Sequence, residues 1–471
     1  VLEVKLKDIA DIIGTDAAYG TIADKLIEYV KAAGYTHIQI MSDDGVFSHK
    51  GYSYAAASYY VPLTKYGSAE DFKQLVNSLH KAGIGVILEW NGAYFGSDMR
   101  GIVNFDGGSC YGYLKPRLDK KPYREVTTFA YDKGEVRSFL ISNLSMWLDE
   151  YHIDGIRLTD TATMLYLDYG KQDGQWVPNK YGGNQNLEAI EFFKHLNSVV
   201  LGRNPGTMMI AEESTAWPKV TGNPEDDGLG FSLKWNMGWM HDFTEYMKLD
   251  PYFRKNAHHM MTFSMEYAYS ENYILVLSHD EVVHLKCSML NKMPGEGFDK
   301  YANLKAAYAF MTGHPGKKLL FMGQEFAQLR EWSEERELDW FLLGEEKHRD
   351  LKDFVQTLLK MYRKYPALYG TDTDPSGFEW INADDGDRSI YSFVRKSPTK
   401  RNNLLVVCNF TPVERPDYRV GVPKKKQYTL VLDENGQTAK KVFKAEKQDC
   451  DNRPFSFAYP LPAYGVAVFQ Y

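Results

Sequence analysis

The feature that most constrains the fold is a repeated phrase in which an amphipathic helix is followed by a short buried strand. One copy begins at Ser68 and Asp71, which are spaced as a helix capping box, and continues with apolar residues at helical intervals. Gly83 ends this helix, and residues 85–88 (GVIL) form an apolar run that predicts a fully buried parallel strand.

The same phrase recurs along the first four-fifths of the chain. A second copy opens with Asp132 and Glu135, which we expect to begin a helix. The expected strands are 2–4, 37–40, 85–88, 155–158, 208–211, 231–235, 273–277 and 318–322, and further helices are expected at 21–33, 187–200, 237–249, 303–312 and 351–362. Eight alternating units predict an α/β fold, a closed (β/α)₈ TIM barrel over residues 1–370. A doubly wound open sheet is the structural alternative.

The pattern changes after about residue 370 to short runs of alternating apolar and polar residues. Strands are expected at 389–394, 404–410, 428–432 and 464–469, with a turn at Asn435-Gly436. Residues 371–471 are therefore predicted to form a small C-terminal antiparallel β-sandwich.

Composition narrows the classes of partner. The formal net charge of -7 disfavours nucleic acid, because polyanion binding needs a basic surface. The four cysteines lie far apart without metal-ligand spacing, which predicts reduced thiols, a cytoplasmic setting and no bound metal. No apolar stretch is long enough to cross a bilayer, so no membrane association is expected, and nothing indicates a cofactor.

Polar residues follow several of the predicted strands, where the active groups of such barrels lie. They are Glu89 after the third strand, Thr159 and Asp160 after the fourth, Glu212 and Glu213 after the fifth, and 278–281 (SHDE) after the seventh. A barrel-rim salt bridge is the simpler reading of any one of them. Together they indicate a site for a neutral polar ligand, with acid–base chemistry available.

Longer phrases carry a resemblance to the family 13 glycoside hydrolases, and within them to the bacterial 1,4-α-glucan branching enzymes. The phrases are 60–67 (YVPLTKYG), 83–90 (GIGVILEW), 150–157 (EYHIDGIR), 164–169 (MLYLDY), 210–218 (IAEESTAWP), 234–240 (KWNMGWM), 277–284 (LSHDEVVH) and 318–323 (KLLFMG). They extend over nearly the whole chain. The amino-terminal carbohydrate-binding module typical of these enzymes is expected to be absent, because Val1 already begins the barrel.

The resemblance implies a retaining mechanism on α-1,4-glucan or maltooligosaccharide, in which one carboxylate attacks the sugar and a second donates a proton. It places the acid/base at Glu212 and the carboxylate that stabilises the transition state at Asp280. It also implies that His279 binds ring hydroxyls, that Tyr52 stacks on the ring and that Arg157 orients the nucleophile. A protein partner cannot be identified from the sequence.

Three departures from the family pattern fall on the subsite of the scissile sugar. The family phrase D-G-x-R-x-D puts the nucleophile two residues after the arginine, where this chain has Thr159. The family's D-W-V-P-A-H-F corresponds to 89–95 (EWNGAYF), so Glu89 replaces aspartate and Tyr94 replaces histidine. A threonine hydroxyl needs an adjacent base to attack, whereas a carboxylate is ionised at pH 7.

Neighbouring groups offer two possible substitutes for the nucleophile. Asp160 adjoins Thr159, but alternation along a strand predicts that its side chain faces away unless a bulge turns it back. Glu89 is one methylene longer than the family aspartate, although it approaches from another strand. Trp217, close behind Glu212, is a candidate for the cleft, with core packing as an equal alternative.

These observations lead to three functional hypotheses. The preferred one is a glucan-recognising homologue of branching enzyme, a pseudoenzyme whose transferase activity is lost or severely impaired. The second is an active branching enzyme that uses Asp160 or Glu89 as nucleophile. The third is a non-catalytic binding protein for another ligand.

Overall fold

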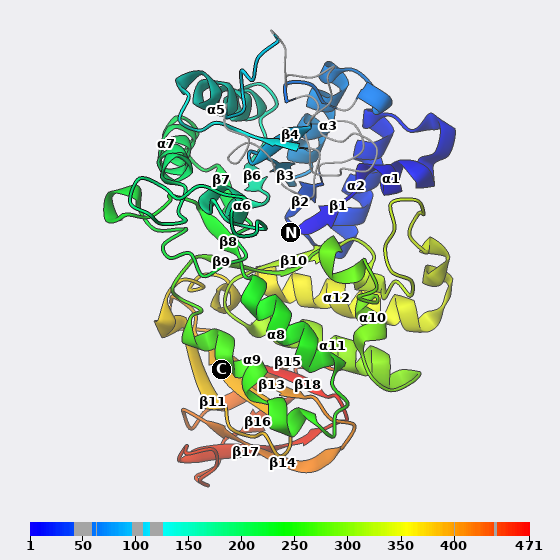
Figure 1. The fold of residues 1–471 in the computed structure, drawn as a ribbon. Helices are drawn as coiled ribbons and strands as arrows, with labels where there is room; N and C mark the ends of the chain where they lie inside the picture. The colour runs from blue at the N-terminus through cyan, green and yellow to red at the C-terminus, as the bar shows by residue number, and fades with distance from the viewer. Residues whose placement is uncertain (42–58, 63, 97–106, 114–125, 400, 438–439) are drawn as a thin grey trace. The chain divides into compact units, whose positions relative to one another are not determined.

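The computed structural model describes residues 1–41, 59–62, 64–96, 107–113, 126–399, 401–437 and 440–471 (Figure 1). Eight parallel strands close into a barrel in the order β1-β10-β9-β8-β7-β6-β3-β2. Their bounds are β1 (Leu2–Val4), β2 (His37–Ile40), β3 (Gly85–Trp90), β6 (Gly155–Leu158), β7 (Met208–Ala211), β8 (Leu233–Trp235), β9 (Tyr273–Leu277) and β10 (Lys317–Phe321). The predicted TIM barrel is confirmed, and the open-sheet alternative is wrong.

The chain divides into two compact units, one of residues 1–31 and 35–235 and the other of residues 32–34 and 236–471. In the first unit the strand register places side chains for the site. Glu89 on β3 lies opposite Arg157 on β6, and Leu158 lies opposite Ala211 of β7. Residues at the carboxyl ends of these neighbouring strands are therefore brought close together.

Helices separate the parallel strands. The main ones are α1 (Leu6–Ile13), α2 (Tyr19–Ala33), α3 (Ala69–Lys81), α5 (Gly134–Asp149), α6 (Thr161–Leu165), α7 (Leu187–Arg203), α8 (Met237–Lys248), α11 (Phe298–Gly313) and α12 (Glu346–Lys364). The capping box at Ser68 and Asp71 is confirmed, because each side chain accepts a hydrogen bond from the other's backbone N–H. The predicted start at Asp132 is wrong by one position, since the extended Lys133 precedes α5 without a side-chain cap.

The C-terminal strands are antiparallel, as predicted. A six-stranded sheet runs β11-β12-β13-β18-β15-β16, and β14 pairs with β17. Their bounds are β11 (Phe378–Asn382), β12 (Ile390–Arg395), β13 (Leu404–Asn409), β14 (Arg415–Val422), β15 (Gln427–Asp433), β16 (Val442–Lys444), β17 (Phe455–Leu461) and β18 (Val466–Gln470). Buried Leu405, Phe457 and Phe469 belong to one apolar cluster among these strands. The domain boundary at residue 370 stays a prediction.

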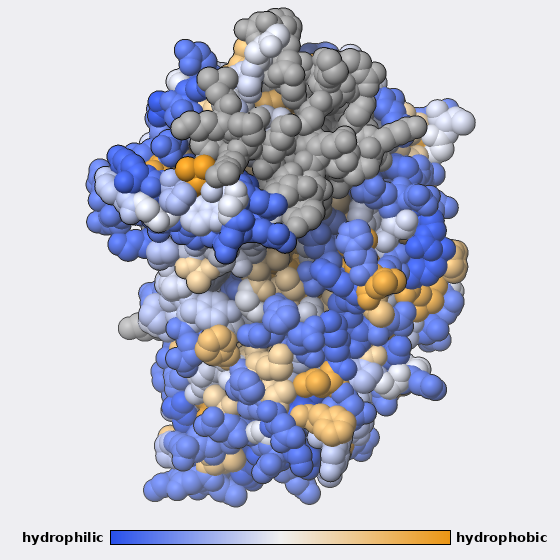
Figure 2. Space-filling view, viewed as in Figure 1, coloured by the Kyte–Doolittle hydropathy of each residue, from blue (hydrophilic) through white to orange (hydrophobic). Residues whose placement is uncertain are grey.

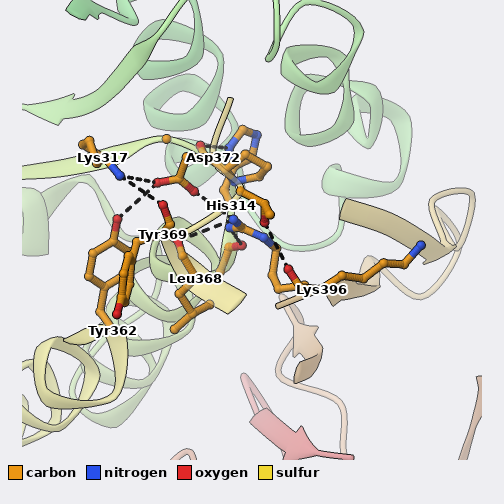
Figure 3. A network of polar contacts seen from close by, with 12 residues as sticks. His314, Lys317, Tyr362, Leu368, Tyr369, Asp372 and Lys396 are labelled. Carbon is orange, nitrogen blue, oxygen red and sulfur yellow. Dashed lines mark hydrogen bonds and ion pairs between the residues drawn. The ribbon is translucent and has the colours of Figure 1, made fainter. Parts of the chain in front are cut away.

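A buried network centred on Asp372 ties β10, α12 and β12 together within the second unit (Figure 3). Asp372 accepts hydrogen bonds from Arg395 at 2.8 Å, from Lys317 at 3.0 Å and from the Tyr362 hydroxyl at 3.4 Å. Burial lowers the pKa of the neighbouring Lys318 to about 7. Buried charges in proteins are normally paired in this way, because an unpaired charge loses its hydration without compensation.

Two surface properties of the described residues bear on partners. Figure 2 shows hydrophilic side chains over most of the visible face, with hydrophobic ones in separate small groups. Among the helices that the structure describes, none combines the length and apolar character needed to span a bilayer.

Candidate active site

Arg157 lies at the centre of a buried charge cluster at the carboxyl end of β6. Its Nη1 donates a short hydrogen bond to Glu89, and its Nη2 donates to Glu212 Oε2 at 2.5 Å. The guanidinium carbon stands 3.9 Å from the centroid of the Trp235 ring. Arg157 therefore binds two carboxylates and packs against the Trp235 ring, and it is only 1% exposed.

The Arg157 guanidinium compensates for the burial of the carboxylates that it binds. A guanidinium that donates a hydrogen bond to a carboxylate stabilises its negative form. For Glu89, which is 2% exposed, the pairing offsets the loss of hydration.

Thr159 continues β6 beyond its last assigned residue. Its backbone N–H donates to the Trp90 carbonyl at 3.0 Å, so the pairing with β3 extends to this position. Side chains two residues apart on a strand share a face, which places the Thr159 hydroxyl on the side of Arg157. The hydroxyl is buried, and no hydrogen-bond partner for it occurs among the described residues.

Asp160 departs from the conformation that the sequence prediction assumed. Its backbone is left-handed, with φ 54° and ψ 32°, so the extended strand ends before it and alternation no longer fixes where its side chain lies. The hydroxyl of Tyr94, on β4 (Tyr94–Gly96), donates a short hydrogen bond to the Asp160 carboxylate. Asp160 is thus hydrogen-bonded to Tyr94, one of the three residues that depart from the family pattern.

A second buried ion pair lies immediately beside Glu212 and was not predicted. Lys234 on β8 donates to Glu213 at 2.7 Å, and the Thr215 hydroxyl donates a short hydrogen bond to the same carboxylate. Lys234 also reaches the Thr215 carbonyl at 3.3 Å. These contacts fix the segment that follows β7. The sequence feature that could have predicted this ion pair is Lys234 itself, a charged residue within the predicted strand 231–235.

Trp217 follows in the same segment and is 8% exposed. Its ring packs edge-on against Tyr166, with 5.2 Å between the ring centroids. Its role as a cleft residue stays a prediction. Tyr52, the predicted stacking residue, lies outside the described residues.

His279 and Asp280 belong to the second unit, in the turn η6 (His279–Val282) that follows β9. His279 Nε2 is 3.5 Å from Asp280 Oδ1, and the imidazole packs edge-on against Trp332 at 5.6 Å between ring centroids. The histidine is 3% exposed, whereas the aspartate side chain keeps 33% of its surface exposed. The aspartate is therefore the more accessible of the two polar groups.

Metal coordination finds no support in the described ranges, where no group of three or more histidine, cysteine, aspartate or glutamate residues is arranged to hold an ion. Apart from the Thr159 hydroxyl, the polar side chains described above form ion pairs and hydrogen bonds. Such an arrangement can bind hydroxyl groups and transfer protons.

Comparisons with known proteins agree with this architecture. Residues 120–398 match the alpha amylase catalytic domain, and residues 380–471 match the alpha amylase C-terminal all-beta domain. A 1,4-alpha-glucan branching enzyme GlgB of Butyrivibrio fibrisolvens is 55% identical over 463 residues, covering 96% of this chain and 72% of the relative.

Two further relatives carry the same name. The protein of Halothermothrix orenii is 44% identical over 97% of this chain and 74% of its own length. The protein of Rubrobacter xylanophilus is 46% identical over 97% of this chain, which spans only 64% of that relative. With its barrel, its C-terminal antiparallel domain and these identities, the chain belongs to the 1,4-alpha-glucan branching enzyme family within the α-amylase family.

Proposed function

We propose that this chain recognises α-1,4-glucan but has lost most or all of the transferase activity of its family. The observation that carries the proposal is the buried hydroxyl of Thr159, which has no hydrogen-bond partner among the described residues; the resemblance expects the nucleophile at this residue. Without a base, a hydroxyl is a poor nucleophile at neutral pH.

The lack of a carboxylate on Thr159 supports the same conclusion. A retaining mechanism needs a carboxylate that attacks the anomeric carbon and offsets its positive charge in the transition state. Threonine supplies neither. Loss of the nucleophile in other covalent catalysts lowers the rate on the order of 10³-fold or more.

Recognition of glucan rests on the polar residues that remain. The relatives are named for action on 1,4-alpha-glucan. Arg157, Glu212, His279 and Asp280 match the family's binding and catalytic positions, and their side chains can exchange hydrogen bonds with sugar hydroxyls. The role proposed for the protein is glucan binding, for scaffolding or for regulation of an active partner.

Two measurements test the proposal. Incubation with amylose, followed by iodine-complex spectra and by chain-length analysis after debranching, should reveal no new branch points. Maltoheptaose should raise the melting temperature, because a ligand at about 100 times its dissociation constant stabilises by about 2.7 kcal/mol. Robust branching would reject the loss of activity, and absence of any thermal shift would favour a protein that binds a different ligand.

A second candidate is an active branching enzyme with Asp160 as nucleophile. It is favoured by the left-handed backbone of Asp160, because strand alternation then no longer directs the carboxylate away from Arg157; the Tyr94 hydroxyl donates a hydrogen bond to this carboxylate. A fluorinated glycosyl donor should label Asp160 if this is correct, as peptide mapping would reveal. Asp160→Asn would then abolish turnover, with Asp168→Asn on the following loop as the matched control.

A further inference from the structure

A cavity of about 410 Å³ opens in the first unit at residues that the candidate active site does not include. Its walls come from residues 113 and 132–133, the loop 167–186 between α6 and α7, and the first turn of α7. The polar side chains that line it are Tyr113, Asp132, Lys133, Asn179, Lys180, Asn186 and Glu188. The volume falls within the range of about 300–1,000 Å³ typical of small-molecule sites.

The walls of this cavity are held by hydrogen bonds of their own. Lys133 donates to three backbone carbonyls, those of residues 109, 110 and 112, at 2.9–3.1 Å. Asn179 closes a turn by accepting from the N–H groups of Tyr181 and Gly183 at 2.9 and 3.1 Å. Asn186, which is 5% exposed, caps α7 through the N–H of Ala189. A ligand therefore meets a preformed surface, which reduces the entropy lost on binding.

The lining selects a neutral, hydroxyl-rich ligand. The two carboxylates, Asp132 and Glu188, are matched by the two ammonium groups, Lys133 and Lys180, so the cavity has no excess charge to attract an ion. Burial raises the pKa of Tyr113 far above its usual value, so the phenol stays neutral and can donate a hydrogen bond. Carboxylates, a phenol and an ammonium group together complement sugar hydroxyls, which both donate and accept.

The loop that lines the cavity also reaches the segment of the acid/base position. The Tyr169 hydroxyl lies 3.3 Å from Ser214 Oγ, two residues beyond Glu212. On the same loop Tyr181 is 79% exposed, with the Lys180 ammonium 5.1 Å from its ring centroid. An exposed aromatic face beside hydrogen-bonding groups is a common platform for sugar rings.

We propose that this cavity is a second α-glucan site, which holds a glucosyl segment on the loop 167–186 apart from the candidate active site at Arg157 and Glu212. The inference rests on the proposed glucan recognition and adds the place of a second contact. A chain bound at both places gains avidity when its length spans the two sites.

Calorimetric titration of the full chain with maltoheptaose tests the inference. The parent should show two classes of site. Val177→Trp, which fills the cavity, and Glu188→Gln, which removes a carboxylate from its wall, should each weaken one class at least tenfold. Glu191→Gln, on the same helix but outside the cavity, is the matched control and should leave both classes unchanged. Asp280→Asn should weaken the other class alone.

The outcomes separate the two proposals. If the cavity variants bind as the parent does while Asp280→Asn loses binding, the second site is rejected and glucan recognition by the candidate active site stands. If only the cavity variants lose binding, the second site stands and recognition at the candidate active site fails. A parent that binds no maltoheptaose overturns both. Unchanged melting temperatures of Val177→Trp and Glu188→Gln would exclude misfolding as the cause.

Discussion

Replacing Thr159 with aspartate probes how the charge cluster around Arg157 is balanced. The guanidinium already binds Glu89 and Glu212. A third carboxylate on the same face is repelled by both, and two like charges about 4 Å apart repel by about 4 kcal/mol at an effective dielectric constant of about 20. Relaxation and water entry relieve part of this. We therefore expect Thr159→Asp to lower the free energy of unfolding by about 3 kcal/mol.

The matched control and the partner substitution make the reasoning specific. Thr159→Asn adds a side chain of similar size without charge and should be clearly less destabilising. Glu89→Asp shortens the side chain that holds Arg157 Nη1 and leaves this group for the new carboxylate. The double variant Thr159→Asp/Glu89→Asp should therefore be more stable than additivity predicts, by about 1 kcal/mol or more.

Urea unfolding followed by tryptophan fluorescence measures the stability of the parent, the three single variants and the double variant. Equal stability of the aspartate and asparagine variants, with additivity within about 0.3 kcal/mol, would show that Arg157 does not limit the charge at this place. Adding Tyr94→His completes the family residues. If the surrounding shell is intact, this triple variant should branch amylose on the order of 10³-fold faster than the parent.

Three other predictions concern buried charges. Burial raises the pKa of Glu325 from 4.5 to about 7, so the native state retains a proton that the unfolded chain releases. The free energy of unfolding should therefore fall by up to about 3 kcal/mol as the pH rises through this interval. Urea unfolding of Glu325→Gln at several pH values should lack this pH dependence. Asp372→Asn leaves Arg395 buried without its carboxylate and should lower the free energy of unfolding by about 3 kcal/mol, whereas adding Arg395→Met should recover much of the loss in the same urea assay. Lys234→Met should destabilise by a similar amount through the unpaired Glu213, and Glu213→Gln in the same chain should restore part of the stability.

The barrel strands were predictable because their signal is local. Residues 155–158, 208–211 and 273–277 are apolar runs bounded by polar segments, and the structure assigns β6, β7 and β9 to these bounds. The strands β14 and β17 were missed, since polar residues such as Arg415 and Asp417 obscure the alternation and the two strands pair across a long stretch of chain. Helix α1 was missed because it follows β1 after one residue and has no side-chain cap.

The proximity of some site residues could be predicted, but their contacts could not. Strand ends point to Glu89 and Glu212 because parallel strands bring their carboxyl ends to one edge, and the structure brings both side chains to Arg157, while their roles stay predictions. Which carboxylates the arginine binds depends on register and side-chain length. The Tyr94–Asp160 hydrogen bond depends on one left-handed residue, and such a conformation leaves little trace in an apolar–polar pattern.

The Asp372 network has a practical consequence for anyone who shortens this chain. Arg395 belongs to β12, whereas Lys317 begins the barrel strand β10, and both donate hydrogen bonds to the Asp372 carboxylate. A truncation before Phe378 would remove all the antiparallel strands of the C-terminal region and would leave Asp372, Lys317 and Lys318 without Arg395. The last hundred residues therefore stabilise the barrel strand β10, and we expect poor expression of a barrel that lacks them.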